Sequence, residues 1–395
     1  MGKVPALMTA LLIGMSTLAA CGTDTTPVPA PQTTAATALP TPDRREPSPA
    51  PTPEPVQVSI AAAGDILPHA FVNESASGYA GGSGYDYSPM FEEVAPLLSG
   101  AQLAICHLET PLSPEGNDLS AWGAMNFNSP RELATALAGA GYDGCEFASN
   151  HTMDRGLDGL AATEQIVREA GLGYAGPTMN PERAGRAELY ELDGVRVAHL
   201  AYTYTLPNDG SPTTTIPDGA PWLAEASWPS IGAAGILTHA RAARDAGADF
   251  VVVSMHWGTE YQAMPTSDQT SLAHELLASN EVDLILGTHA HVIQPCEVIN
   301  GRHVIYGMGN SLSNQSPSQA AGLLPETQDG MIALVTLTKE PSGEVTTQLA
   351  YQPTHVEIPG HRIRLVTPES HPDSWQRTTS ALDRLGGCGA QALHP

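Results

Sequence analysis

Two histidines stand two residues apart in the segment LILGTHAHVIQP at residues 284–295, directly after a short apolar run. The apolar run predicts a buried strand, and a pair of imidazoles at its end packs poorly in an apolar core. Neutral imidazole is also the commonest metal ligand among the side chains. We therefore take His289 and His291 as candidate metal ligands.

Polar residues that can bind a metal follow four other apolar runs in the same way. Each run has the length of a short buried strand. The runs and the residues after them are 58–63 with Asp65 and His69, 103–108 with Glu109, 144–149 with Asn150, and 250–255 with His256. Because ligands of open α/β sheets bind at the carboxyl ends of the strands, these residues are expected to converge on one site.

Carboxylate, amide oxygen and imidazole together form a ligand set that suits Mn, Fe or Zn. No cysteine lies among the candidates, which favours a catalytic site over a structural zinc site. Six or seven ligands are too many for one tetrahedral ion and suit two ions that share a bridging carboxylate. The sequence therefore predicts two divalent metal ions (Mn, Fe or Zn), with His289 and His291 on different ions.

Each candidate also has an ordinary structural explanation. Asp65 can cap a turn, Asn150 can occupy a turn with positive φ, and Glu109 can end an exposed edge strand. A lone histidine is usually a surface residue or a satisfied core residue. Eight of the 14 histidines are assigned to such positions: His199, His239, His274, His303, His355, His361, His371 and His394. The shared position of the candidates after apolar runs is what favours a site.

Helix-like segments alternate with the apolar runs, which is typical of an α/β fold. They are residues 88–101, 130–142, 157–171, 235–247 and 268–280, with a further amphipathic helix at 371–387. Glycine after aspartate or asparagine suits a type I′ turn. Asp193-Gly194 and Asn300-Gly301 therefore predict two hairpins.

The first 20 residues carry one lysine, a short apolar stretch and small residues before Cys21, as a secretory signal peptide does. Residues 18–21 also resemble the bacterial lipobox, which implies that Cys21 is the lipidated first residue of the mature protein. An ordinary signal with a chance cysteine is the alternative. Residues 21–55 contain ten prolines and predict an extended tether. We expect an extracytoplasmic protein, lipid-anchored to the bacterial cell membrane, with a folded domain at 56–357 and a C-terminal extension at 358–395 packed on it.

The chain has a formal net charge of −25. Such a surface repels nucleic acid and anionic lipid, so nucleic acid is not an expected partner and membrane contact is expected through the lipid anchor only. An anionic ligand can approach only where a metal or another cation reverses the local field. Solubility alone explains the acidity equally well.

Four cysteines remain beyond the lipobox, and outside the cytoplasm they permit two disulfides in three connectivities. Cys106 and Cys145 each lie in a predicted strand just before a polar cluster. This position favours their pairing and leaves Cys296 with Cys388. Reduced buried cysteines are the alternative.

Six segments occur in an order that resembles a known family: GDILPHA, YDYSPMFEEVAPLLSGAQLAICHLETPLS, FASNHTMDRGLDGLAAT, SMHWGTEY, LILGTHAHVIQP and VIYGMGNSLSNQ. They are similar to the CapA/PgsA family of bacterial capsule and poly-gamma-glutamate synthesis proteins over residues 57–316. That family resembles a branch of the calcineurin-like metallophosphoesterases. The resemblance implies a four-layer α/β sandwich, in which two mixed β-sheets pack face to face with helices outside.

The resemblance also assigns roles to single residues. Asp65 takes the place of the first-motif aspartate, Glu109 that of the bridging carboxylate, and Asn150 that of the amide ligand. The implied imidazole ligands are His256, His289 and His291.

The remaining roles concern proton transfer and the pocket wall. His151 takes the place of the histidine that protonates the leaving group, and Asp154 is spaced to orient it, with a helix N-cap as its alternative role. Trp257, Glu260 and Asn310 are implied to line the pocket.

Three positions depart from the pattern of the wider superfamily. The first motif there has aspartate and histidine one residue apart, whereas His69 is four residues from Asp65. Glu109 is one methylene longer than the usual aspartate. His107 stands where the family usually has asparagine.

Two main functions are compatible with these residues, and a third leaves the site vestigial. The first is a metal-dependent hydrolase of a phosphoester or related bond in an envelope polymer or its precursor. The second is an accessory protein that binds an anionic polymer such as poly-gamma-glutamate and works with membrane synthase or export partners. In the third, an envelope adaptor binds no metal.

Overall fold

A computed structural model describes residues 26–27, 29–30, 54–210 and 214–394. The predicted signal peptide, the lipidation site Cys21 and nearly all of the predicted tether lie outside the described residues. Within the described part of the chain, no helix combines the length and the apolar character needed to cross a membrane.

The larger of two main sheets has nine strands and is mixed. The strands of its main path, in spatial order, are β16 (Arg362–Leu365), β15 (Val345–Glu357), β14 (Asp329–Lys339), β1 (Val56–Leu67), β2 (Leu103–Leu108), β5 (Gly144–Glu146) and β6 (Gly173–Ala175). In addition, β13 (Asn310–Ser313) pairs with β1, and β17 (Gln391–Ala392) pairs with β15. The central strand β1 is parallel to β2 and β13 and antiparallel to β14. The C-terminal part of β1 therefore lies between β2 and β13, next to the predicted metal ligands.

The second sheet has six strands and is also mixed. Its order is β11 (Ile293–Ile299), β12 (Arg302–Met308), β10 (Leu284–Thr288), β9 (Phe250–His256), β8 (Val195–Thr203) and β7 (Glu188–Leu192). The two predicted hairpins are confirmed as the antiparallel pairs β7–β8 and β11–β12. Positive φ angles occur at both residues of each turn, as a type I′ turn requires: Asp193, Gly194, Asn300 and Gly301. A separate two-stranded sheet joins β3 (Leu112–Ser113) and β4 (Ser129–Pro130).

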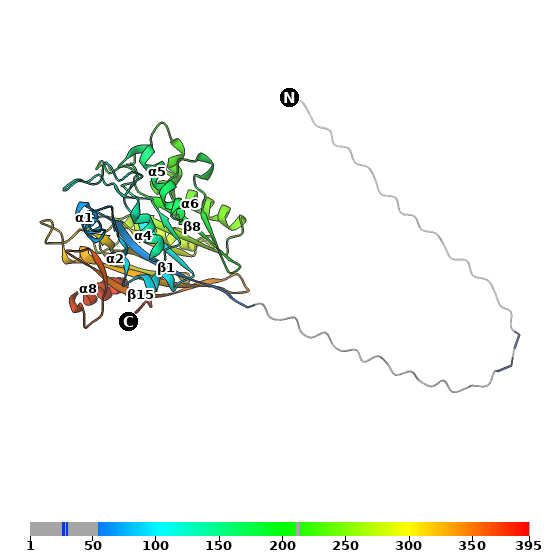
Figure 1. Cartoon of the computed structure of the whole chain (residues 1–395). Coiled ribbons are helices and arrows are strands. Elements are labelled where there is room, and N and C mark those ends of the chain that lie inside the picture. Colours follow the sequence, from blue (N-terminus) through cyan, green and yellow to red (C-terminus); the bar gives the residue numbers. More distant parts are fainter. Residues whose placement is uncertain (1–25, 28, 31–53, 211–213, 395) are drawn as a thin grey trace, which may run out of the picture. The chain divides into compact units, whose positions relative to one another are not determined.

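The two main sheets pack face to face and are covered by helices on their outer faces (Figure 1). On β1, Val58 and Ile60 belong to the core between the sheets, whereas Ala61 faces the helices, as the two-residue period of a strand requires. The helices over the larger sheet are α1 (Ala70–Tyr79), α2 (Ser88–Phe91), α3 (Ala95–Ser99), α4 (Glu132–Gly139) and α5 (Gly156–Glu169). Those over the second sheet are α6 (Trp228–Asp245) and α7 (Ser267–Ala278). The predicted four-layer α/β fold is therefore confirmed.

Several elements differ in extent from the sequence prediction, and two of the differences have a clear cause. The segment 88–101 forms two short helices, α2 and α3, because Pro96 has no N–H for a hydrogen bond to the preceding turn and lies in the first turn of a new helix. The run 144–149 is a strand only as far as Glu146. The chain leaves the sheet there and enters the loop that carries Asn150.

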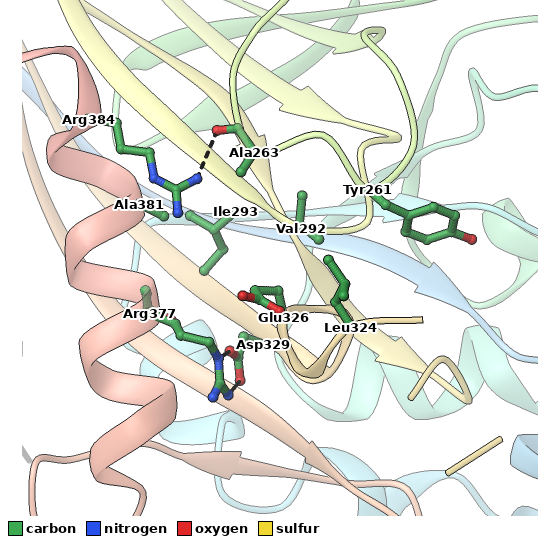
Figure 2. Close-up of a pocket in the computed structure, with 11 residues that line it drawn as sticks. Tyr261, Ala263, Val292, Ile293, Leu324, Glu326, Asp329, Arg377, Ala381 and Arg384 are labelled. Carbon is green, nitrogen blue, oxygen red and sulfur yellow. Dashed lines mark hydrogen bonds and ion pairs between the residues drawn. The ribbon is translucent and has the colours of Figure 1, made fainter. Parts of the chain in front are cut away.

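The C-terminal segment is part of the fold, since β16 and β17 extend the larger sheet and α8 (Pro372–Leu382) packs near β15 (Figure 1). On α8, Arg377 pairs with the buried carboxylate of Asp329 at 2.6 Å, beside a small cavity (Figure 2). A disulfide joins Cys296 of β11 to Cys388, and another joins Cys106 to Cys145 across β2 and β5. These are the two pairs that the sequence favours. Short 3₁₀ helices occur at Pro181–Arg183, Pro221–Ala226, Pro325–Gln328 and Asp383–Leu385.

Candidate metal centre

Asp65 lies near the end of β1, where the backbones of three strands bring polar side chains together. In the strand register it faces His107 of β2 on one side and Asn310 of β13 on the other. All three side chains are buried, with 2% exposure or less. The approach of β1 to the turn before β13 is close, because a Cβ at Gly64 would lie 1.9 Å from the carbonyl oxygen of Gly309.

The loop after β10 places both of its histidines against Asp65. The His291 Nδ1 atom lies 2.9 Å from one Asp65 carboxylate oxygen, and the backbone N–H of His289 donates to the other at 3.2 Å. His291 Nδ1 is also 3.0 Å from Asn310 Oδ1. Both histidines have positive φ angles, 88° and 55°, which are uncommon for residues with a side chain. The loop therefore holds two imidazoles in a strained backbone, a feature that clusters at functional sites.

Glu109 and Asn150 meet His256, the last residue of β9, on the other side of the centre. The His256 Nε2 atom lies 3.0 Å from Asn150 Oδ1 and 3.5 Å from Glu109 Oε1. Its other ring nitrogen is 3.2 Å from the Thr288 hydroxyl. All of these side chains are buried, so the strand-end residues predicted from five separate runs do converge, with His69 as the exception described below.

Two groups of ligand atoms result, and they share Glu109. One contains His107, Glu109 and His256, and the other contains Asp65, Glu109 and His291. Within each group the ligand atoms lie within 4.8 Å of one another. A carboxylate common to two groups is the arrangement expected of a bridged pair of metal ions.

Unpartnered buried atoms test whether these residues fit a metal. Four such atoms belong to the centre: both carboxylate oxygens of Glu109, His107 Nε2 and His289 Nδ1. An unsatisfied buried polar atom is costly, and each in a native protein calls for an explanation. Each of these atoms can coordinate Mn, Fe or Zn, so the residues fit a divalent metal site.

The charges in the centre are unevenly distributed. Burial and the neighbouring Asp65 charge raise the pKa of Glu109 well above its usual value. Burial also raises the pKa of Asp65, but the hydrogen bond and charge of His291 outweigh this effect and lower it. Burial and the charge of His291 lower the pKa of His289 to about 3. The His289 imidazole is therefore neutral at neutral pH, which is the form that binds metals.

His151 and Asp154 form a hydrogen-bonded pair in the loop before α5. The His151 Nδ1 atom is 2.7 Å from Asp154 Oδ2, which also accepts the backbone N–H of Phe127 at 2.6 Å. The Phe127 ring packs on the His151 ring with centroids 4.3 Å apart. Asp154 does not cap α5, whose N-cap residue is Arg155, so the alternative role as a cap does not apply. Asp154 fixes the orientation of His151 and leaves the Nε2 atom free for chemistry.

Residues 59–315 match the family described as bacterial capsule synthesis protein PGA_cap. The chain belongs to this family. It is 28% identical over 254 residues to the capsule biosynthesis protein CapA of Bacillus anthracis, covering 64% of this chain and 59% of that protein. It is 27% identical over 227 residues to the PGA biosynthesis protein CapA of Bacillus subtilis, covering 57% of each chain. The chain therefore spans less than two thirds of the length of these relatives.

Other similarities are weaker. A probable polyglutamine synthesis accessory protein of Mycobacterium tuberculosis is 24% identical over 232 residues, with 56% of this chain and 58% of that protein covered. Among solved structures, a calcineurin-like phosphoesterase from Bacillus subtilis aligns with a TM-score of 0.41 and 14% identity, over 82% of this chain and 98% of that chain. A phosphatase from Mycoplasma pneumoniae aligns with a TM-score of 0.42 and 13% identity, over 76% and 94%.

Two site residues predicted for this PGA_cap protein lie elsewhere. His69 belongs to neither ligand group, and its Nδ1 atom lies 3.0 Å from the Leu67 carbonyl oxygen. Trp257 was expected in the pocket, but it lies in the core between the second sheet and its helices, where its N–H donates to the Tyr306 carbonyl at 2.9 Å. The prediction for Trp257 is wrong because Trp257 follows directly after the end of β9 and its side chain packs under the helices, whereas the His256 side chain faces the centre.

Asn310 and one unpredicted residue do belong to the centre. Asn310 contacts His291, whereas Glu260, which is half-buried, lies outside both ligand groups and acts only through its charge, which raises the pKa of Glu109. His107 is the residue that sequence reasoning missed, because it looks like part of the apolar run 103–108. Burial lowers the pKa of His107, but the charges of Glu146 and the centre outweigh it and raise the pKa to about 9.

Proposed function

We propose that this protein is a metal-dependent hydrolase of a phosphoester or related bond in a cell-envelope polymer, in capsule or poly-gamma-glutamate biosynthesis. The observation that carries the proposal is the pair of buried ligand groups sharing Glu109, with four donor atoms that have no protein partner. Family membership supports the envelope polymer as the setting. Anchoring through lipidated Cys21 at the outer face of the cell membrane is part of the proposal.

The ligands of the proposed centre divide between its two sides. Asp65 and His291 lie on one side, His256 and Asn150 on the other, and Glu109 is close to both. His289 offers an unpartnered Nδ1 atom as a further ligand. Two divalent ions bound there would lower the pKa of a water and neutralise charge on a phosphoryl oxygen.

His151 acts as the general acid in the proposed reaction. Its Nδ1 atom faces the Asp154 carboxylate, so the imidazole donates there and its Nε2 atom is the one that exchanges a proton with substrate. The protonated Nε2 gives its proton to the leaving oxygen. The Asp154 carboxylate stabilises the imidazolium before that transfer, and the Phe127 ring limits rotation of the imidazole.

A cavity of about 260 Å³ lies beside the proposed centre. Its wall contains the exposed Trp122 together with His69 and Tyr261, and the Tyr261 ring lies 6.0 Å from that of His291. None of the described residues lining this cavity is lysine or arginine. In a protein of net charge −25, an anionic polymer would therefore be held by the metal ions, and its binding should require them.

Hydrolysis of a chromogenic phosphodiester by the purified chain tests the proposal. We expect activity that depends on Mn, Fe or Zn and disappears with a chelator. His151→Gln should lower kcat about 10²- to 10⁴-fold, the usual contribution of a general acid, with metal content unchanged. His274→Gln, on an exposed helix face, is the matched control and should keep full activity. Metal-loaded protein without hydrolysis of phosphodiesters, phosphomonoesters or envelope polymers would contradict the hydrolase function.

A second candidate is a non-catalytic accessory protein that binds an anionic polymer and works with membrane synthase or export partners. The described residues of the cavity wall include no lysine or arginine, so polymer binding should need the metal ions in both functions. The two functions therefore differ in their need for His151. As an accessory protein, the chain would bind poly-gamma-glutamate in a metal-dependent manner, and His151→Gln would leave binding and biosynthesis intact. As a hydrolase, the same variant would stop function while polymer binding persists.

A further inference from the structure

We infer that His107, oriented by Glu146, is an additional metal ligand that replaces the histidine missing from the first motif. The inference rests on the proposed metal centre and extends it to a residue that the family pattern does not assign.

The His107 side chain presents one bonded and one free nitrogen. Its Nδ1 atom contacts the Glu146 carboxylate, whereas its Nε2 atom is buried and has no hydrogen-bond partner. The Nε2 atom lies 3.8 Å from Asp65 and 3.8 Å from Glu109. Both distances are too long for hydrogen bonds, and His107 forms a group of ligand atoms with Glu109 and His256.

Glu146 determines which nitrogen faces the centre. The two residues are opposite each other in the parallel pair β2–β5, and the second Glu146 oxygen accepts the backbone N–H of Ala148 at 2.8 Å. A carboxylate fixed in this way accepts a hydrogen bond from His107 Nδ1, so Nε2 is the nitrogen that faces the centre and would bind a metal after losing its proton. Carboxylate–histidine–metal arrangements of this kind orient metal ligands and raise their basicity.

His107 also brings an imidazole to Asp65 from a neighbouring strand. The residue two positions after Asp65 is Leu67, and His69 has its Nδ1 atom against the Leu67 carbonyl. His107 lies on β2 and Glu109 follows directly after its end, and the His107 Nε2 atom is 3.8 Å from the Glu109 carboxylate. The imidazole of His107, on the neighbouring strand β2, thus lies beside Asp65 at the same register position. In the usual first motif, β1 itself would supply this imidazole.

Metal affinity and the visible spectrum of bound Co²⁺ in the full chain test this inference. We expect His107→Asn to lower metal stoichiometry by about one ion per chain, or to weaken one site at least tenfold. Glu146→Gln should weaken binding about 10- to 100-fold and change the Co²⁺ spectrum, because the imidazole keeps its position but loses its orienting partner. His199→Asn changes another buried histidine, one that contacts Ser254 outside the centre, and should leave stoichiometry and spectrum unchanged.

The outcomes separate this inference from the proposed function. A native chain that binds no metal would overturn both. A native chain that binds metal, with His107→Asn and Glu146→Gln retaining its affinity and its Co²⁺ spectrum, would overturn only the role of His107. Thermal unfolding in chelator, measured for each variant, identifies a variant that fails to fold, and Glu146→Gln then decides the question because it preserves shape.

Discussion

Replacing Glu109 by glutamine should stabilise the metal-free protein and abolish its stabilisation by metal. In the metal-free chain both Glu109 oxygens are buried without a partner, and the nearest imidazole nitrogen is 3.5 Å away on His256. Burial and the Asp65 charge raise the pKa of Glu109, so the ionised form is destabilising there. Glutamine keeps the shape and removes the charge.

The expected size of the effect follows from the cost of such groups. At pH 7, folding must either protonate this carboxylate or bury its charge, at about 1.4 kcal/mol for each pH unit by which its pKa is raised, so we expect a gain of about 1–3 kcal/mol in the free energy of unfolding. At roughly 2 °C per kcal/mol for a large domain, Tm in chelator should rise by about 2–6 °C. In the native protein, metal at 100 times its Kd adds about 2.7 kcal/mol and raises Tm by about 5 °C, whereas Glu109→Gln should show no such rise.

Circular dichroism melts with chelator and with excess Mn²⁺ provide the assay. Glu260→Gln is the matched control, because it removes a nearby carboxylate outside both ligand groups and should keep the metal-induced shift. The reasoning would be refuted if Glu109→Gln lowered Tm in chelator, or if it retained the metal-induced rise of the native protein.

Three further predictions concern stability and the geometry around the centre. Gly64→Ala should destabilise the fold by about 3 kcal/mol and impair metal binding, because its Cβ would meet the Gly309 carbonyl oxygen at 1.9 Å; urea unfolding and elemental analysis check this. Cys388→Ser should cost about 2–5 kcal/mol in urea unfolding by removing the bond to Cys296, and an unchanged midpoint would contradict it. Burial lowers the pKa of His199 to about 4 from 6.5, so the unfolded state takes up a proton first as the pH falls. Stability should therefore decline by about 1.4 kcal/mol per pH unit below 6.5, levelling off near pH 4, and His199→Leu should remove this part of the slope in melts across that range.

The sequence predicted the location of the centre because each candidate is a polar residue directly after an apolar strand. Glu109, His256 and the two histidines of the β10 loop all lie at strand ends in the structure, which brings distant parts of the chain together. The alternation of apolar runs and helix-like segments likewise predicted the α/β layers.

Other features depend on tertiary contacts that local patterns do not contain. His107 was missed because an inward histidine within an apolar run looks like an ordinary core residue until its neighbours are known. The family motif predicts Trp257 in the pocket, whereas in the structure it follows the end of β9 and packs in the core between the second sheet and its helices. The division of the segment 88–101 into two helices follows from Pro96, which the apolar pattern of the segment does not reveal as a break.

Metal content per chain tests the central claim most directly. The full chain is purified without chelator and analysed for Mn, Fe and Zn beside His289→Ala and Asn150→Ala. A dinuclear centre predicts about two ions per native chain and a clear decrease in both variants. Less than roughly one tenth of an ion per native chain, even after incubation with each metal, would contradict the two-metal centre.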